Sequence, residues 1–201
     1  MSRTLRPVGD RAFLIECSGE EPAGVALAVR AAGLAGVVDV VPAATTVLVT
    51  VDRGDRLAAV AGPAADVVAV PAAASAPIVV LEVAYDGPDL EAVAARAGMA
   101  VDEVVARHLA GSYRVAFCGF APGYAYLEGL DPALHVPRRA EPRTRVPAGA
   151  VAVAGPYTAV YPRATPGGWQ LLGTCRERLW DPAGDPPSRL VPGTPVRFTR
   201  R

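Results

Sequence analysis

The chain has 201 residues, no net formal charge and 51% hydrophobic residues. This length gives one large domain or two small ones with a real core, and the composition excludes a largely disordered protein. Zero net charge argues against a general binder of nucleic acid or of anionic membranes. All 20 basic residues are arginine, so lysine chemistry such as a Schiff base or a phosphate-loop lysine is excluded.

The cysteines and histidines are too few and too scattered to form a disulfide framework or a metal site. Three cysteines lie far apart without a C-x-x-C pair, and only two histidines occur, so we expect no disulfide framework and no metal site. The first residues lack the apolar segment of a secretory signal, and prolines break the longest apolar stretch, residues 56–81. We therefore expect a cytoplasmic protein that does not span a membrane.

The first third of the chain predicts a small α+β unit. In chain order, the expected elements are two strands within residues 3–17, a helix at 22–32, strands at 36–41 and 45–51, and a helix at 55–61. Pro22 suits the first turn of the first helix and Gly33 the position after its end. This order predicts a sandwich with helices on one face of an antiparallel sheet.

Residues 71–77 form the best linker candidate, because this Ala/Ser segment lacks periodicity and has a proline at each end. We expect two domains, residues 1–74 and 75–201. The second domain starts with a strand at 78–85, a helix with Asp89 as its expected N-cap, and a second helix at 101–109. Short strands then alternate with Pro/Gly turns, as in a β-barrel or sandwich. They are expected at 113–117, 151–154, 158–161, 169–173 and 196–199.

No familiar catalytic motif is present, and the chemistry-bearing residues gather between positions 108 and 174. The Thr165-Pro-Gly-Gly-Trp segment offers a hydroxyl, a flat apolar wall at Trp169, and two glycines, Gly167 and Gly168. The glycines permit positive φ and a close approach of a ligand to the backbone. The alternative is a tight turn that leads into a strand whose tryptophan packs in the core.

Four arginines occur within residues 138–145, and guanidinium groups bind carboxylates and phosphates. Arg143, between Pro142 and Thr144, is the preferred anion contact, whereas a solvated loop is the alternative for any one of these arginines. The aromatic run at residues 119–126 either lines a pocket or anchors its own loop. His108 lies on or beside the apolar face of its predicted helix. It is a weak candidate for a general base, and the alternative is a buried structural histidine.

A series of motifs covers nearly the whole chain in a specific order. They are Pro7–Ala12, Gly87–Leu90, His108, Tyr113–Val115, Gly119–Leu127, Pro137-Arg138, Pro142-Arg143, Val146–Gly149, Tyr161-Pro162, Pro166–Trp169 and Gly173-Thr174. In this order and spacing the chain resembles the family called allophanate hydrolase subunit 1, Kip-type sporulation-kinase inhibitor, or 5-oxoprolinase B subunit. The resemblance implies a small N-terminal α+β domain followed by a cyclophilin-like β-barrel domain.

The resemblance also implies an activity and partners. The family's enzyme is an ATP-dependent 5-oxoprolinase that opens 5-oxo-L-proline to L-glutamate, in which this chain would act with a C-type and an A-type subunit. Its substrate is a small carboxylate with a neutral lactam, so we expect substrate binding by Arg143, Tyr161, Thr165, Gly167, Gly168 and Trp169 in one pocket. The alternatives are an inhibitor of a sensor histidine kinase, a urea- or allophanate-processing subunit, and a prolyl isomerase suggested by the barrel alone.

Overall fold

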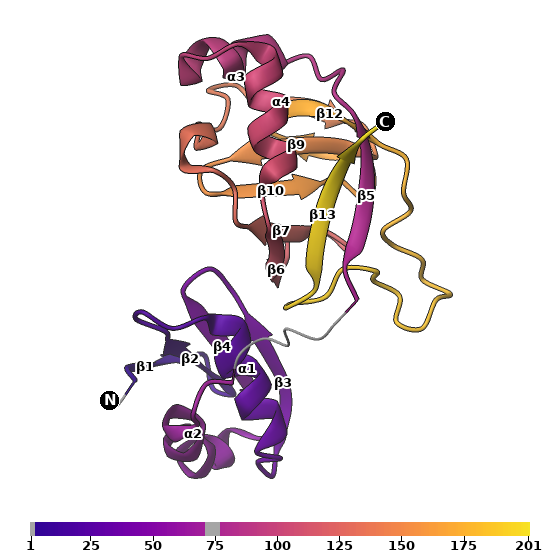
Figure 1. Cartoon of the computed structure of the whole chain (residues 1–201). Coiled ribbons are helices and arrows are strands. Elements are labelled where there is room, and N and C mark those ends of the chain that lie inside the picture. The colour runs from indigo at the N-terminus through magenta and orange to yellow at the C-terminus, as the bar shows by residue number, and fades with distance from the viewer. Residues whose placement is uncertain (1–2, 71–76) are drawn as a thin grey trace. The chain divides into compact units, whose positions relative to one another are not determined.

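The computed structural model describes residues 3–70 and 77–201. The chain separates into two compact units, Met1–Ala74 and Ser75–Arg201, each with its own sheet and core (Figure 1). The linker predicted at residues 71–77 lies outside the described residues except for Pro77.

The N-terminal unit is a four-stranded antiparallel sheet with two helices, in the strand order β1-β2-β4-β3. Its elements are β1 (Leu5–Val8), β2 (Ala12–Glu16), α1 (Pro22–Ala31), β3 (Val37–Pro42), β4 (Thr46–Val51), the short 3₁₀ helix η1 (Gly54–Arg56) and α2 (Leu57–Asp66). Side chains alternate along β2 and β4, and the inward set packs with apolar residues of both helices in one core. The predicted α+β order is confirmed.

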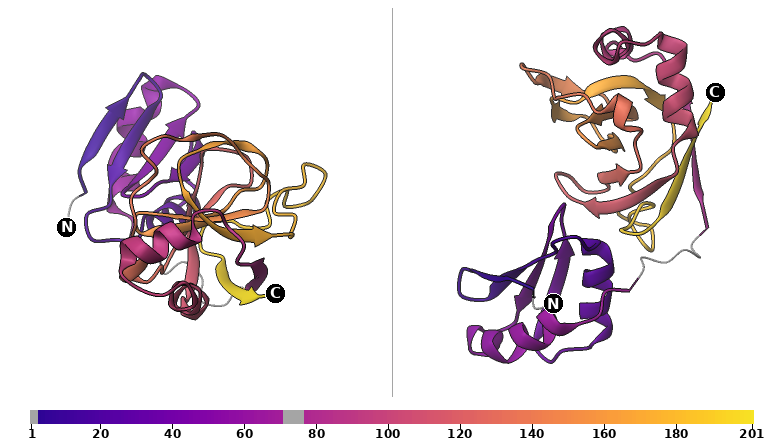
Figure 2. Two further views of the ribbon diagram at one scale, coloured as in Figure 1. Left: turned by 90° about the horizontal axis from the view of Figure 1, so that it is seen from above. Right: turned by 60° about the vertical axis from the view of Figure 1, so that its left-hand side comes forward.

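The C-terminal unit is a closed β-barrel with the strand order β10-β7-β6-β13-β5-β12-β9. Its strands are β5 (Val79–Ala84), β6 (Tyr113–Cys118), β7 (Ala125–Glu128), β9 (Ala150–Ala154), β10 (Tyr157–Val160), β12 (Gln170–Cys175) and β13 (Pro195–Arg200). Every pairing around the barrel is antiparallel except that of β13 with β5, which is parallel. Figure 2 shows the barrel from two further directions. Of the two alternatives for this half of the chain, the barrel is correct.

Two helices, α3 (Leu90–Ala97) and α4 (Val101–Ala110), and the 3₁₀ helix η2 (Pro132–Leu134) accompany the barrel. The inward face of α4 carries Val104, Val105 and His108 into the barrel core, where the His108 ring lies 4.6 Å from that of Phe198. Outside the barrel order, β8 (Arg143–Val146) and β11 (Thr165–Gly167) pair as a separate two-stranded ribbon. This ribbon brings the arginine-rich segment beside the Thr165–Trp169 motif.

Candidate functional site

A small cavity in the C-terminal unit joins four of the motifs found in the sequence. Its volume is about 60 Å³. The residues that line it are Phe120, Tyr124, Tyr126, Arg138, Tyr161, Gly167, Gly168 and Trp169. The aromatic run at 119–126 therefore lies over a pocket, and the tyrosines of this run also pack against one another.

Buried rings form the inner wall of the pocket. Tyr124, Tyr161 and Trp169 are only 1%, 2% and 5% exposed. The ring centroids of Tyr124 lie 5.1 Å from Tyr161 and 5.9 Å from Trp169, in edge-to-face geometry. Burial raises the pKa of both Tyr124 and Tyr161, so their hydroxyls stay protonated at neutral pH and can donate hydrogen bonds.

The two glycines of the pocket serve different purposes. A Cβ at Gly167 would lie 2.4 Å from the Tyr161 hydroxyl, so only glycine fits there. A Cβ at Gly168 would meet Pro142 at 3.6 Å, which is ordinary van der Waals contact. Neither glycine is among the residues with positive φ, so the requirement at Gly167 is a close approach rather than an unusual backbone conformation.

Arg138 supplies the cationic side of the pocket. Its side chain is exposed, and within the described part of the chain no acidic side chain pairs with it. Burial raises the pKa of Tyr124, Tyr126 and Tyr161, and the charge of Arg138 offsets part of each rise. The pocket therefore presents a guanidinium, phenol hydroxyls and flat apolar walls, which together suit a small planar acid.

Of the six residues predicted to share a pocket, Tyr161, Gly167, Gly168 and Trp169 do so, while Arg143 and Thr165 are not among its lining residues. Arg143 donates instead from Nη2 to the Asp89 carboxylate at 2.7 Å. The structure thus separates the two guanidinium groups: Arg138 lines the pocket, while Arg143 has an internal acidic partner. The Nη1 atom of Arg143 and the hydroxyl of Thr165 are buried without a hydrogen-bond partner among the described residues.

Asp89 organises the wall that carries these groups. It occupies the N-cap position of α3, as predicted, but its side chain does not cap the helix. One carboxylate oxygen accepts from Arg143 and from Arg139, and the other accepts from the Leu171 backbone N–H at 2.7 Å. Burial alone would raise the pKa of Asp89, but these donors outweigh it and hold the pKa below its ordinary value.

Two hydrogen bonds to or from the backbone fix the chain on both sides of Arg138. The Arg139 N–H donates to the Gly168 carbonyl at 2.7 Å, and Gln170 donates from Nε2 to the Pro137 carbonyl at 3.1 Å. Arg138 lies between these two anchored residues. Asp89, whose contacts hold Arg139, was missed as a site residue because its arginine partners are at least 50 positions away in the sequence.

His108, the weak catalytic candidate, lies in the core instead of the pocket. It is fully buried, with Nδ1 2.8 Å from the Tyr85 hydroxyl and Nε2 2.9 Å from the Thr158 hydroxyl. The Thr158 hydroxyl donates to the Ala152 carbonyl, so its oxygen accepts from His108 and the ring proton lies on Nε2. Burial lowers the pKa of His108 to about 3, so the structural alternative fits this residue.

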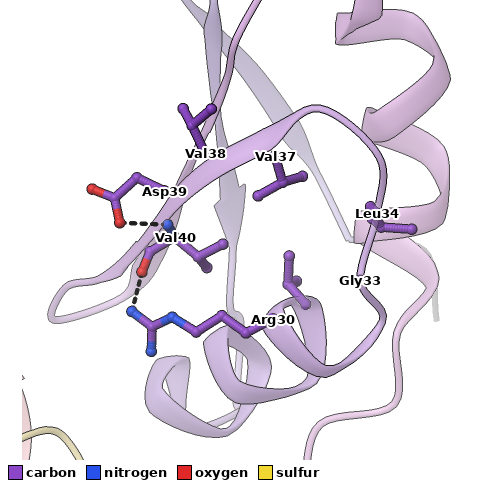
Figure 3. A pocket seen from close by; sticks show the side chains of 8 residues that line it. Arg30, Gly33, Leu34, Val37, Val38, Asp39 and Val40 are labelled. Atoms are coloured by element: carbon purple, nitrogen blue, oxygen red, sulfur yellow. Dashed lines mark hydrogen bonds between the residues drawn. The ribbon is translucent and has the colours of Figure 1, made fainter.

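The N-terminal unit has a wider hollow, about 430 Å³, between α1 and β3 (Figure 3). Apolar side chains line most of it. Its two charged residues both bond the strand's own backbone: Arg30 donates to the Val40 carbonyl, and Asp39 accepts from the Val40 N–H at 2.8 Å. Both charged side chains of this hollow thus bond polar backbone groups at the open edge of β3. Because these bonds give the two side chains a structural role, we place the functional site in the aromatic pocket of the other unit.

Across the described residues, 3–70 and 77–201, no three His, Cys, Asp or Glu side chains gather as metal ligands. No helix in this part of the chain has the length and hydrophobicity needed to cross a membrane.

A family model described as carboxyltransferase domain, subdomain C and D, matches residues 3–190. The chain belongs to this family. A 5-oxoprolinase B subunit of Escherichia coli O157:H7 is 55% identical over 112 residues, which is 56% of this chain and 51% of the relative. The 5-oxoprolinase B subunit of Bacillus subtilis is 44% identical over 126 residues, 61% of this chain and 52% of the relative. The resemblance seen in the sequence motifs is therefore confirmed.

A solved structure agrees with the fold. The crystal structure of the protein TTHA0988 superposes with a TM-score of 0.79 at 38% identity, over 95% of this chain and 40% of that one. The matched regions thus span about half the length of the curated relatives and less than half of the crystallised protein.

Proposed function

We propose that this chain is the B-type subunit of a multi-subunit, ATP-dependent 5-oxoprolinase that hydrolyses 5-oxo-L-proline to L-glutamate. The observation that carries the proposal is the guanidinium of Arg138 beside buried aromatic walls, in a chain whose curated relatives are named as B subunits of 5-oxoprolinase. In this proposal a C-type and an A-type subunit complete the enzyme, and the complex acts in the cytoplasm, where ATP is available.

The residues that line the pocket carry groups that complement the two ends of 5-oxoproline. Its carboxylate pairs with the guanidinium of Arg138, and its flat lactam lies against Trp169 and the tyrosine rings. The Tyr161 hydroxyl accepts from Tyr124 and from the Trp169 backbone N–H, so its own proton is left to donate to the lactam oxygen, where negative charge develops as the ring opens. These residues bind and orient the substrate.

The pocket supplies neither an ATP-binding site nor a general base. A cavity of about 60 Å³ cannot hold ATP, and the chain has no phosphate-binding loop. His108 is neutral and enclosed, and Asp89 is held by two arginines, so neither is available as a general base. ATP activation of the lactam is therefore assigned to the assembled complex, and we expect this chain to be inactive alone.

The test is co-expression with C-type and A-type subunits, followed by an assay for ATP-dependent release of glutamate from 5-oxoproline. We expect this chain and the C-type subunit to elute as one species in size-exclusion chromatography, and the three-subunit mixture to release glutamate. Glutamate release by this chain alone, or none by the full mixture, would contradict the proposal. Stable pairing instead with a sensor histidine kinase would favour the inhibitor alternative.

A further inference from the structure

Phe120 stands apart from the other aromatic residues of the pocket. It is 62% exposed, whereas the rings of the inner wall are almost fully buried. Its φ is 68°, and it is the only non-glycine residue with positive φ among those the structure describes. The Ala121 N–H donates to the Gly119 carbonyl at 2.8 Å, so Phe120 is the centre of a tight three-residue turn.

The fold alone does not account for a phenylalanine at this position. A positive φ is strained for a bulky residue and relaxed for glycine, which occurs at positions 119 and 123 of the same loop. Among the aromatic rings, Phe120 contacts that of Tyr124 in edge-to-face geometry, at a centroid distance of 5.2 Å. Residues with backbone strain of this kind cluster at active sites and ligand-binding sites.

The small size of the pocket indicates a role for the Phe120 side chain. About 60 Å³ holds a few water molecules, whereas ligand pockets typically measure about 300–1,000 Å³. A substrate therefore enters only if a lining side chain moves. Tyr124, Tyr161 and Trp169 are locked in the core, and Gly167 and Gly168 have no side chain to move. The ring of Tyr126 is stacked on that of Phe117 at a centroid distance of 4.3 Å, and Arg138, although exposed, is the charged group of the pocket. Phe120 is therefore the exposed apolar side chain in the pocket wall.

We infer that Phe120 is the adjustable wall of the pocket and a specificity-determining residue. Its ring moves off Tyr124 to admit a small planar lactam acid and then packs on the face of that molecule, so it sets the size of the molecule accepted. This inference rests on the proposed function for the identity of the substrate, but the movable wall itself can be tested without any activity.

The first experiment measures access to Trp169. With Trp180→Phe as background, Trp169 is the only tryptophan, and acrylamide, itself a small planar amide, quenches its fluorescence when it reaches the pocket. Phe120→Gly should raise the quenching constant at least twofold, whereas Val191→Ala, at an exposed apolar residue outside the pocket, should not. An unchanged constant in Phe120→Gly would overturn the inference.

The backbone strain at Phe120 can be tested separately by melting temperature. Phe120→Gly removes the ring and relieves the backbone, while Phe120→Ala removes the ring and keeps the strain. The glycine variant should therefore melt a few degrees above the alanine variant. The reverse order would contradict a strained turn at Phe120.

The second experiment uses the assembled three-subunit enzyme. Phe120→Gly should raise KM for 5-oxoproline at least tenfold with a smaller change in kcat, and should shift kcat/KM at least fivefold toward the six-membered homologue 6-oxopiperidine-2-carboxylate. An unchanged preference would overturn the specificity role. Wild-type enzyme without activity would count against the proposed function alone, because the quenching experiment does not depend on it.

Discussion

The carboxylate of Asp89 and the guanidinium of Arg143 form a largely buried ion pair, with Oδ1 2.7 Å from Nη2 and side-chain exposures of 4% and 22%. The pair joins the start of α3 to the ribbon of β8 and β11, and the second carboxylate oxygen bonds β12 through Leu171. Three segments that are distant in the sequence are thus fixed by one side chain. Asp89 is therefore a positioning residue for the pocket wall that carries Arg138.

Asp89→Asn should lower the free energy of unfolding of the chain by roughly 3 kcal/mol, because it leaves a buried guanidinium without its counter-ion. Urea unfolding followed by circular dichroism measures this. Asp86→Asn, at an exposed carboxylate that accepts from Thr174, is the matched control and should change stability by less than about 1 kcal/mol. Equal effects from the two substitutions would remove the reason for assigning a structural role to Asp89.

The pH dependence gives a second signature of the same pair. The folded-state pKa of Asp89 lies below the ordinary 3.8, so its contribution is complete above the unfolded pKa and is lost as the pH falls through the folded one. Wild-type protein should lose stability over this acid range, and Asp89→Asn should lose less over the same range. A steeper acid loss in the variant would contradict the assignment.

The sequence predicted the fold well where the pattern was local. The alternation in β2 and the helical spacing in α4 mark their own boundaries to within a residue or two. It failed where a strand depends on a distant partner. The charged strand Arg143–Val146 pairs with Thr165–Gly167 about twenty residues later, and no local pattern announces this. The strand Ala125–Glu128 was hidden within the aromatic run that leads into it.

The sequence grouped part of the lining of the pocket but not its charged residue. The glycines, Tyr161 and Trp169 carry a local motif, and the structure brings them together. Selecting one guanidinium from four in eight residues needed tertiary information, since the side chain of Arg143 is occupied by a carboxylate 54 positions earlier. Asp89 itself resembled an ordinary helix cap, and only its partners reveal its role.

Arg138→Ala should weaken binding of the substrate carboxylate by roughly 10- to 150-fold, since losing a charged hydrogen-bond partner costs about 1.5–3 kcal/mol. KM for 5-oxoproline in the assembled enzyme measures this. Because Arg138 is exposed and forms no ion pair within the described residues, the melting temperature should stay within about 2 °C of wild type.

The control for Arg138 is Arg145→Ala, which removes an exposed guanidinium from the neighbouring ribbon. It should leave KM unchanged. An equal rise of KM in both variants would indicate that the net charge of the loop, and not the position of Arg138, attracts the substrate.

His108 should make stability depend on pH in a range where most side chains do not titrate. Its pKa is about 3 in the folded protein and about 6.5 when unfolded, so below pH 6.5 the unfolded state takes up the extra proton. The free energy of unfolding should therefore fall by up to about 1.4 kcal/mol per pH unit from about pH 6.5 toward about pH 3. Urea unfolding at pH 7.5 and 5.5 measures this slope.

His108→Gln removes the titrating ring, so its stability should be lower at pH 7.5 but less dependent on pH between the two values. Wild-type protein measured in parallel gives the reference slope. If His108→Gln also keeps that slope, the ring of His108 is protonated in the folded protein and the hydrogen-bond assignment is wrong.

The edge of β3 provides the last prediction. β3 is an outer strand of its sheet, and an outer strand with free N–H and C=O groups invites another strand to pair with it. Here Arg30 bonds the Val40 carbonyl, Asp39 bonds the Val40 N–H, and Pro42 has no N–H to offer. Val38, 61% exposed beside them, would strengthen association once the edge was open.

The double variant Arg30→Ala, Asp39→Ala should therefore self-associate at concentrations where wild-type protein does not, with at least a tenfold lower dissociation constant in sedimentation equilibrium. Arg53→Ala, Asp55→Ala removes an exposed charged pair at the start of η1 and preserves the net charge in the same way. This control should sediment like wild type. If both double variants associate equally, loss of surface charge is the cause; if neither does, the side chains of Arg30 and Asp39 are not what keeps the edge of β3 closed.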